Sequence, residues 1–333
     1  MAVKTEKVRK SNMEMLRIVS MLMVLAVHVD GASLGLPDAC GDACSLDSRA
    51  WWRLVVEGFA IVGVNCFTMI SGYFGVRLTW RSVVRFLSQC VFYSVGLYTA
   101  MGLYTGFSAP FSWMGWWESW MVITHSDLWY VPAYFLLMLL SPVLNAGFGS
   151  LDRRSFRILL AVMTAMTLWA GWWWKGSFNP SGYTIAQLVY VYAVARYIAL
   201  HGAESVDGTP LRFFGIYLLA VAGVVATAIY ISNDRGFAYN SPFVLLASWA
   251  LFMCFRGMRF QSAVVNDLAK SAFSVYLIHK NPLVWGSYMK PACIWLWQTT
   301  PLWLFSVYAV VMILGIYVLC AAADSLRRRI MPW

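Results

Sequence analysis

The chain has 333 residues, of which 60% are apolar and 12% are charged, and its mean hydropathy is +0.64. Soluble domains carry about 25% charged residues, so this composition excludes water as the main solvent of the fold. The net charge of +10 does not indicate nucleic-acid binding, because the basic residues lie between apolar runs rather than on one face of a soluble unit. We expect an integral membrane protein that contacts membrane lipid and no nucleic acid.

Ten apolar runs are separated by turn residues and charges. An open strand edge is unstable in lipid, and the alternating pattern of a barrel is missing, so we predict an all-α fold with about ten transmembrane helices. About 20 residues cross the hydrocarbon core, so ten crossings leave only short loops. Residues 1–333 are therefore predicted to form one polytopic domain without a separate soluble domain. The runs lie at about 13–30, 54–75, 83–107, 128–148, 156–174, 183–200, 211–231, 241–256, 269–289 and 295–323.

The distribution of basic residues favours one orientation in the membrane. With the N-terminus inside, 18 of the 25 lysines and arginines fall in cytoplasmic segments and six fall in outer loops. This bias follows the positive-inside rule, and an even number of crossings agrees with it. We expect both termini in the cytoplasm. The apolar stretch 13–29 contains charged residues and no cleavage site, so it is predicted to be a retained helix rather than a signal peptide.

The cysteines indicate neither a disulfide framework nor a metal site. Four of the seven lie in separate apolar runs, where a cysteine behaves as a small hydrophobic residue. Cys40 and Cys44 share a predicted outer loop, so a local disulfide between them is left open. No histidine or cysteine pair with zinc-binding spacing lies near them, and we expect no bound metal.

The first predicted helix contains two ionisable residues that are candidates for a site, Arg17 and His28. A helix turns by 100° per residue, so eleven positions return to within about 20° of the same face, at a separation of about 16 Å. Histidine exchanges a proton near neutral pH, and arginine keeps its charge and suits an anion. The structural alternatives are a snorkelling Arg17 and a satisfied polar His28, but the shared face favours a site. Glu14 is expected to pair with Arg17.

Three further groups of residues are candidates, each with a structural alternative. Arg81 and Arg85 lie one helical turn apart, where they either anchor the inner boundary or bind a phosphorylated donor. Ser71 is either a nucleophile or part of a packing pair with Gly72. His279 is either a second site histidine or a structural hydrogen-bond partner for a neighbouring helix.

Five stretches of the chain match one family pattern in the same order. They are Leu16-Arg17 with His28, Asn65 to Phe74, Arg81 to Arg85, Leu128 to Val131 with Ser141-Pro142, and Ser274 to His279. Together they resemble the membrane-bound acyltransferase 3 family, whose members O-acylate bacterial surface polysaccharides. Two positions depart from the pattern. Thr68 replaces a commoner apolar residue, and Asp127 stands where a histidine is frequent, with His125 two places earlier.

The resemblance implies ten helices in a bacterial cytoplasmic membrane. It also implies transfer of an acyl group, usually acetyl, from cytoplasmic acyl-CoA to a hydroxyl of a cell-surface or exported polysaccharide or its lipid-linked precursor. Acyl-CoA is then a co-substrate, with no bound cofactor, and the expected partners are the glycan acceptor and a glycan-synthesis assembly.

The resemblance also implies roles for the candidate residues. Arg17, together with Arg81 and Arg85, would hold the phosphorylated donor. His28 would act as the general base on the acceptor hydroxyl or as the relay for the acyl group. The possible second site comprises His279, Ser71 and Tyr73.

A transporter or flippase of an anionic or lipid-linked substrate is the alternative function. Arg17 and His28 would then form a substrate and proton site. The sequence shows no repeat, no pair of helices broken by glycine or proline, and few buried acidic residues for ion coupling. The distinguishing observation is covalent, since an enzyme leaves an ester on the acceptor and a transporter does not.

Overall fold

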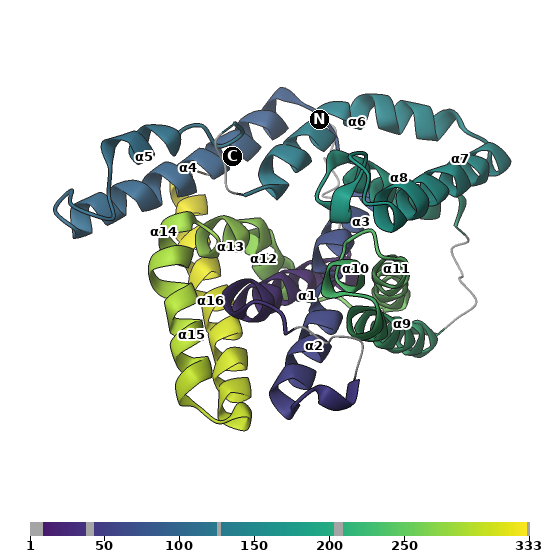
Figure 1. Ribbon diagram of the computed structural model, residues 1–333. Helices are drawn as coiled ribbons and strands as arrows, with labels where there is room; N and C mark the ends of the chain where they lie inside the picture. Colours follow the sequence, from purple (N-terminus) through teal and green to yellow (C-terminus); the bar gives the residue numbers. More distant parts are fainter. Residues whose placement is uncertain (1–8, 38–42, 125–127, 203–208, 332–333) are drawn as a thin grey trace.

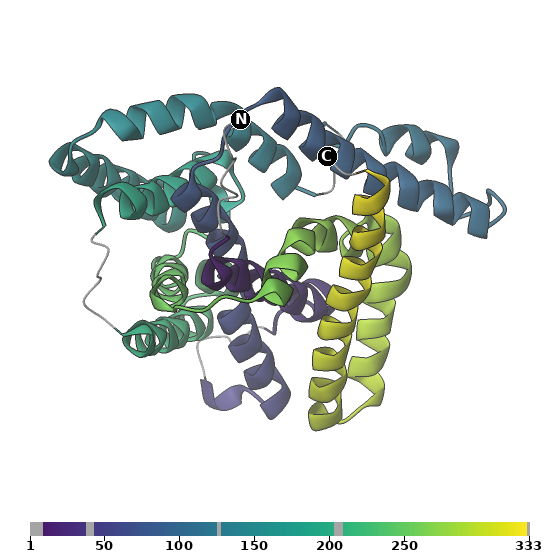
Figure 2. The same cartoon turned by 180° about the vertical axis from the view of Figure 1, so that it is seen from behind.

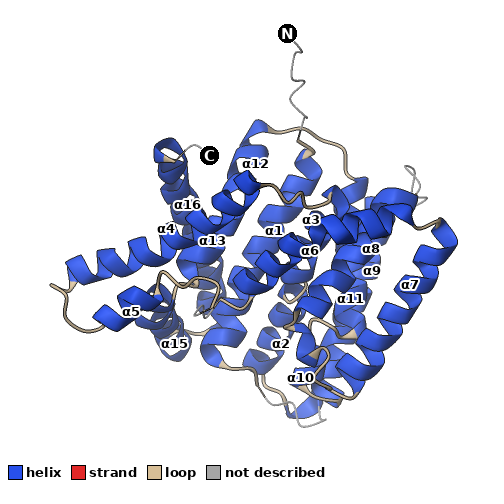
Figure 3. Cartoon of the chain, turned by 90° about the horizontal axis from the view of Figure 1, so that it is seen from above, coloured by secondary structure: helices blue, strands red, loops and turns tan. Residues whose placement is uncertain are grey.

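The computed structural model describes residues 9–37, 43–124, 128–202 and 209–331. Within these ranges every regular element is a helix, as the composition predicts (Figure 3). The protein is therefore an all-α membrane protein. His125 lies outside these ranges, and so does Cys40, the first partner of the disulfide with Cys44 that the sequence left open.

Seven helical stretches of the described chain are long and apolar enough to cross a membrane. They are Ser11–Ala32, Ser48–Phe74, Trp80–Tyr104, Tyr130–Ser150, Arg153–Trp173, Pro210–Tyr230 and Leu302–Ile330. Two shorter apolar helices, α8 (Ile185–His201) and α11 (Pro242–Gly257), coincide with two more of the predicted runs. The total of ten crossings stays a prediction.

The C-terminal region differs from the predicted pattern. The run expected at 269–289 is divided into several short helices, and Pro282 explains the break because it has no N–H to continue a helix. Asn281 caps the next turn by accepting a hydrogen bond from the Leu283 N–H. The elements are α12 (Ala263–Leu268), η5 (Ala269–Ser271), α13 (Ala272–His279), α14 (Pro282–Val284), η6 (Trp285–Met289), α15 (Lys290–Thr299) and α16 (Leu302–Ile330). The last long helix thus begins at Leu302 rather than near residue 295.

Helix α1 (Ser11–Val27) runs through the middle of the molecule and continues into a π-helical turn, η1 (His28–Ala32). It contacts α2 (Ser48–Ala60), α3 (Gly63–Phe74), α11, α12, α13 and α16. Figures 1 and 2 show the antiparallel pair α15 and α16 on one side of α1, with α9 and α11 on the other. Side chains on opposite faces of α1 therefore face different parts of the fold.

The remaining helices surround this centre. A short helix, α5, follows the long α4 and carries several exposed tryptophans, which suit a membrane boundary. These elements are η2 (Ala43–Ser45), α4 (Trp80–Tyr104), α5 (Trp113–Glu118), α6 (Tyr130–Ser150), α7 (Arg153–Met166), η3 (Thr167–Trp173), η4 (Pro180–Gly182), α9 (Pro210–Tyr230) and α10 (Asn233–Gly236).

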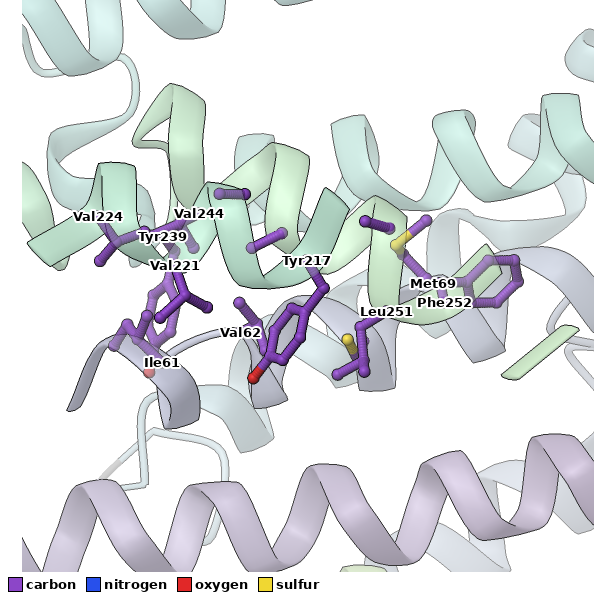
Figure 4. Packing of buried hydrophobic residues seen from close by; sticks show 14 of the residues in the cluster. Ile61, Val62, Met69, Tyr217, Val221, Val224, Tyr239, Val244, Leu251 and Phe252 are labelled. Carbon is purple, nitrogen blue, oxygen red and sulfur yellow. The ribbon is translucent and has the colours of Figure 1, made fainter. Parts of the chain in front are cut away.

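The largest apolar core lies where α2 and α3 meet α9 and α11. Figure 4 shows Ile61 and Val62 beside Val221, with Tyr217 reaching across the same interface. In lipid such contacts act through close packing rather than through the exclusion of water. At Gly72 of α3 the backbone comes close to α8, since an added Cβ would lie 2.5 Å from the Tyr192 carbonyl oxygen. This is the tight backbone contact expected for the Ser71-Gly72 pair.

Two hydrogen bonds, one near each end of the helix formed by α1 and η1, join segments that are far apart in the sequence. At the end where α1 begins, the side-chain amide of Asn12 donates to the Phe255 carbonyl oxygen over 3.0 Å. At the end where η1 stops, the side-chain amide of Asn233 donates to the Pro37 carbonyl oxygen over 2.8 Å. The first bond joins segments predicted to be cytoplasmic and the second joins segments predicted to be outside, and the orientation in the membrane stays a prediction.

Candidate active site

Two histidines from distant parts of the chain meet in the structure. His28 opens the π-helical turn η1 and His279 ends α13, and their Nδ1 and Nε2 atoms lie 2.8 Å apart. The other nitrogen of His279, Nδ1, lies 2.6 Å from the Val275 carbonyl oxygen. His279 is 1% exposed, and His28 is partly buried. The structure thus joins two residues that the sequence proposed separately.

This geometry fixes the tautomers of both rings when they are neutral. A carbonyl oxygen only accepts hydrogen bonds, so the Nδ1–H of His279 donates to Val275. The Nε2 of His279 then carries a lone pair and accepts from the Nδ1–H of His28. The hydrogen-bond network thus places the proton of neutral His28 on Nδ1. It leaves Nε2 of His28 with a free lone pair, which is the state that a general base requires.

His28 lines an apolar cavity between α1, α3, α6 and α13. Its volume is about 70 Å³, several times the space that one water molecule needs. It therefore has room for an acyl group of a few non-hydrogen atoms. The lining residues are Met21, Val24, Val27, His28, Ala60, Ile61, Val64, Phe67, Trp129, Tyr130, Tyr239, Phe273, Tyr276 and Lys280.

Neighbouring aromatic and ionic contacts hold the His28 turn in place. The Trp285 ring meets the His28 ring edge-on at 5.4 Å, and the Lys280 ammonium lies 4.2 Å from the centre of the Trp285 ring. Two residues after His28, the buried Asp30 carboxylate accepts a hydrogen bond of 2.6 Å from Arg53 on α2. π-Helical turns are rare and occur mostly at functional sites. These contacts restrict the orientation of His28 before any substrate binds.

Arg17 lies toward the other end of α1. It forms the predicted ion pair with Glu14, with 2.9 Å between nitrogen and oxygen, and its side chain keeps 30% of its exposure. Part of its side chain therefore stays accessible at the end of the molecule where α1 begins.

Arg81 and Arg85 are exposed on the first turns of α4. Thr79 and Ser82 form a capping box at the start of this helix, which sets the direction of both arginines. Between them and the membrane core, Phe86 stacks on aromatic rings of α6 and α13. The four-residue spacing therefore gives a cationic surface at the helix start, as predicted.

Ser71 and Tyr73 make other contacts. The Ser71 hydroxyl lies 3.2 Å from both the Phe67 carbonyl oxygen and the Tyr134 hydroxyl. The Tyr73 ring contacts Phe252 edge-on at 5.6 Å. Within the described chain, no contact joins Ser71 or Tyr73 to the histidine pair.

The described residues contain no group of three or more His, Cys, Asp or Glu side chains placed to hold a metal ion. The protein groups that make up the candidate site are a histidine pair and an apolar cavity, with cationic side chains nearer the start of α1. The sequence did not mark Trp285 or Tyr130 as site residues. An aromatic residue in an apolar run looks the same whether it lines a cavity or packs in a core.

Comparison with known families identifies the chain. A family model described as an acyltransferase domain, that of acyltransferase 3, matches residues 10–321. The chain therefore belongs to this family and is a membrane acyltransferase. The matched range includes Arg17, both histidines of the pair, and the arginines of α4. Neither the curated proteins nor the solved structures contain a match.

Proposed function

We propose that the protein transfers an acyl group, acetyl in the first instance, from cytoplasmic acyl-CoA to a hydroxyl of a cell-surface or exported polysaccharide or its lipid-linked precursor. The observation that carries the proposal is the histidine pair at the edge of an apolar cavity, because it supplies a base beside a space for the acyl group. A bacterial cytoplasmic membrane gives this reaction acyl-CoA on one side and exported glycan on the other.

The proposed reaction has two proton transfers, one from the acceptor hydroxyl to His28 and one from His28 to the CoA thiolate. The Nε2 atom of His28 takes the proton of the acceptor hydroxyl while the hydroxyl oxygen attacks the carbonyl carbon of the thioester. The carbon–sulfur bond then breaks, and the CoA thiolate takes the proton back from His28, which leaves an ester and CoA thiol. His279 accepts a hydrogen bond from His28 throughout and so holds the ring in position. A positioned base of this kind contributes about 10²- to 10⁴-fold in rate.

We assign three arginines to the binding of the acyl-CoA donor. Arg81 and Arg85 have exposed guanidinium groups that suit the phosphates of CoA, because arginine binds phosphate oxygens through two parallel hydrogen bonds. Arg17 would bind a donor group nearer the cavity, and the acyl end would extend along the apolar lining to His28. Membership of an acyltransferase family favours this reaction over the transport of an anionic substrate.

The test incubates purified protein in nanodiscs with radiolabelled acetyl-CoA and a panel of bacterial glycans. We expect label in at least one glycan with the native protein, and a loss of at least a hundredfold in His28→Ala. His201→Ala is the matched control, because His201 lies at the end of α8 and packs on Phe156 away from the cavity. A fully active His28→Ala protein would remove the assigned base. Absence of labelled glycan and of CoA release would overturn the reaction itself and direct the next test to uptake in vesicles.

A further inference from the structure

A second cavity lies directly beside the one that contains His28. Its volume is about 280 Å³, and the two cavities share Val27 and Ile61 as lining residues. It is formed by η1, α2, and the segments around residues 181–183 and 233–238, which belong to the end of the molecule where η1 stops. This cavity thus reaches the acyl-group cavity from the side opposite to the start of α1.

A buried carboxylate lines this second cavity. Glu57 on α2 is only 3% exposed, and its Oε2 atom has no hydrogen-bond partner in the described part of the protein. The carboxylate packs against Gly31 of η1, where an added Cβ would lie 2.9 Å from the Oε2 atom. The neighbouring Arg53 donates its Nε–H to Asp30 and another N–H to the Gly35 carbonyl oxygen. A carboxylate inside a membrane protein is costly unless it is paired, so the free oxygen indicates a missing hydrogen-bond donor.

The position of Glu57 connects the second cavity to the histidine pair. Gly31, against which Glu57 packs, is the third residue after His28 in the same π-helical turn, η1. A group held by Glu57 would therefore lie beside the turn that carries the base. The ring of Tyr183, which lines the second cavity, lies 4.9 Å from the ring of Tyr239, which lines the first, measured between their centres.

The chemistry of the lining fits a sugar. Val27 and Ile61 give an apolar floor, and Ser181, Asn233 and Glu57 place polar groups around it. Ligand sites usually combine such an apolar surface with a few polar groups that set orientation. The free Glu57 oxygen can only accept when it is ionised, and hydroxyl groups of a sugar ring are donors.

We propose that this second cavity binds the sugar acceptor and that Glu57 accepts a hydrogen bond from a hydroxyl of the sugar, which directs a neighbouring hydroxyl toward His28. The inference rests on the proposed function and adds to it the place where the acceptor binds. Glu57 binds the acceptor and takes no part in the proton transfer.

The test compares two variants with a matched control. Glu57→Gln keeps the size of the side chain and removes its charge. Gly31→Ala keeps the charge, but its new Cβ would lie 2.9 Å from the Glu57 Oε2 atom and so displaces the carboxylate. Glu118→Gln makes the same chemical change in a different cavity on α5. The measurements are KM for the glycan acceptor, KM for acetyl-CoA, and the slow hydrolysis of acetyl-CoA without acceptor.

Glu57→Gln and Gly31→Ala are expected to raise KM for the acceptor about tenfold to a hundredfold, because each loses a charge-assisted hydrogen bond. KM for acetyl-CoA and the acceptor-free hydrolysis should stay within about twofold, and Glu118→Gln should behave like the native protein. An unchanged acceptor KM in Glu57→Gln would overturn the proposal. An equal loss of acceptor-free hydrolysis would also overturn it, because Glu57 would then have only a structural role.

A binding experiment tests the sugar site independently of the proposed acyl transfer. Inactive His28→Ala protein is titrated with methyl glycosides of common hexoses and N-acetylhexosamines, and binding is followed by intrinsic tryptophan fluorescence. Saturable binding that Glu57→Gln weakens at least tenfold supports the sugar site even if no acyl transfer is found. Binding that Glu57→Gln leaves unchanged, or no binding of any glycoside, contradicts the sugar site even if transfer occurs.

Discussion

The hydrogen bond between the two histidines gives the sharpest test of the mechanism. His279→Leu removes the acceptor of the His28 Nδ1–H, which lies 2.8 Å away. A hydrogen bond between neutral groups contributes about 0.5–1.5 kcal/mol, or about two- to thirteenfold in rate. His279→Leu also removes the restraint that keeps the His28 proton on Nδ1, and this loss lowers the rate by a further factor of the same order. We therefore expect kcat to fall about tenfold to a hundredfold, which is less than the loss in His28→Ala.

The assay measures transfer of labelled acetyl groups at saturating acceptor and donor, over a range of pH. In the native protein, log kcat should rise with a slope of about one on the acid side and then level off, because His28 must be unprotonated to act as a base. His279→Gln is the conservative variant, since its amide oxygen keeps an acceptor near the position of Nε2, and it should recover part of the rate. Thermal unfolding in detergent checks that each variant is folded.

The double variant decides whether the pair acts as a unit. If His279 acts through His28, then His28→Ala combined with His279→Leu should be no slower than His28→Ala alone. A native kcat in His279→Leu, or losses that multiply in the double variant, would refute the conclusion that the hydrogen bond from His28 to His279 positions the base.

Two further predictions concern the donor surface and the fold. Arg85→Gln should raise KM for acetyl-CoA about tenfold, with kcat little changed, and Arg154→Gln, an exposed arginine on α7, should have no such effect in the same kinetic assay. Equal KM values for the two variants would contradict the assignment. Asp324→Asn should lower the free energy of unfolding by about 3 kcal/mol, because the buried carboxylate binds Tyr93, Ser274 and Arg327. Thermal unfolding in detergent measures this loss, and an Asp324→Asn protein as stable as its neighbour variant Ser325→Ala would disprove it.

Composition and periodicity were enough to predict the all-helical membrane class and most of the spans. Those features depend on local patterns, since an apolar run of sufficient length has to be a helix in lipid. The helical period also placed the Arg17–Glu14 ion pair correctly, because the two residues are three positions apart. The break at Pro282 has a local signal as well, in the Asn281-Pro282 pair, but the high hydropathy on both sides concealed it.

The contacts that complete the site could not be predicted from local patterns. His28 and His279 are 251 positions apart, and a single sequence does not show which helices become neighbours. Glu57 was not a candidate from the sequence, because one acidic residue near the end of an apolar run does not show whether it is buried. Only the packing of η1 on α2 shows that it is buried beside Gly31.

Val27 and Ile61 are the two apolar side chains that line both cavities. Their position affects how easily protons could leak across the membrane at this point. A protein that exposes a donor to one compartment and an acceptor to the other brings the two aqueous phases close together at this point. A continuous file of water there would let protons cross, and each proton releases about 2.3 kcal/mol per 100 mV of membrane potential. Hydrocarbon walls repel such a water file while an acyl group passes. On the proposed route, these two residues act as an electrical seal that keeps glycan modification from discharging the membrane.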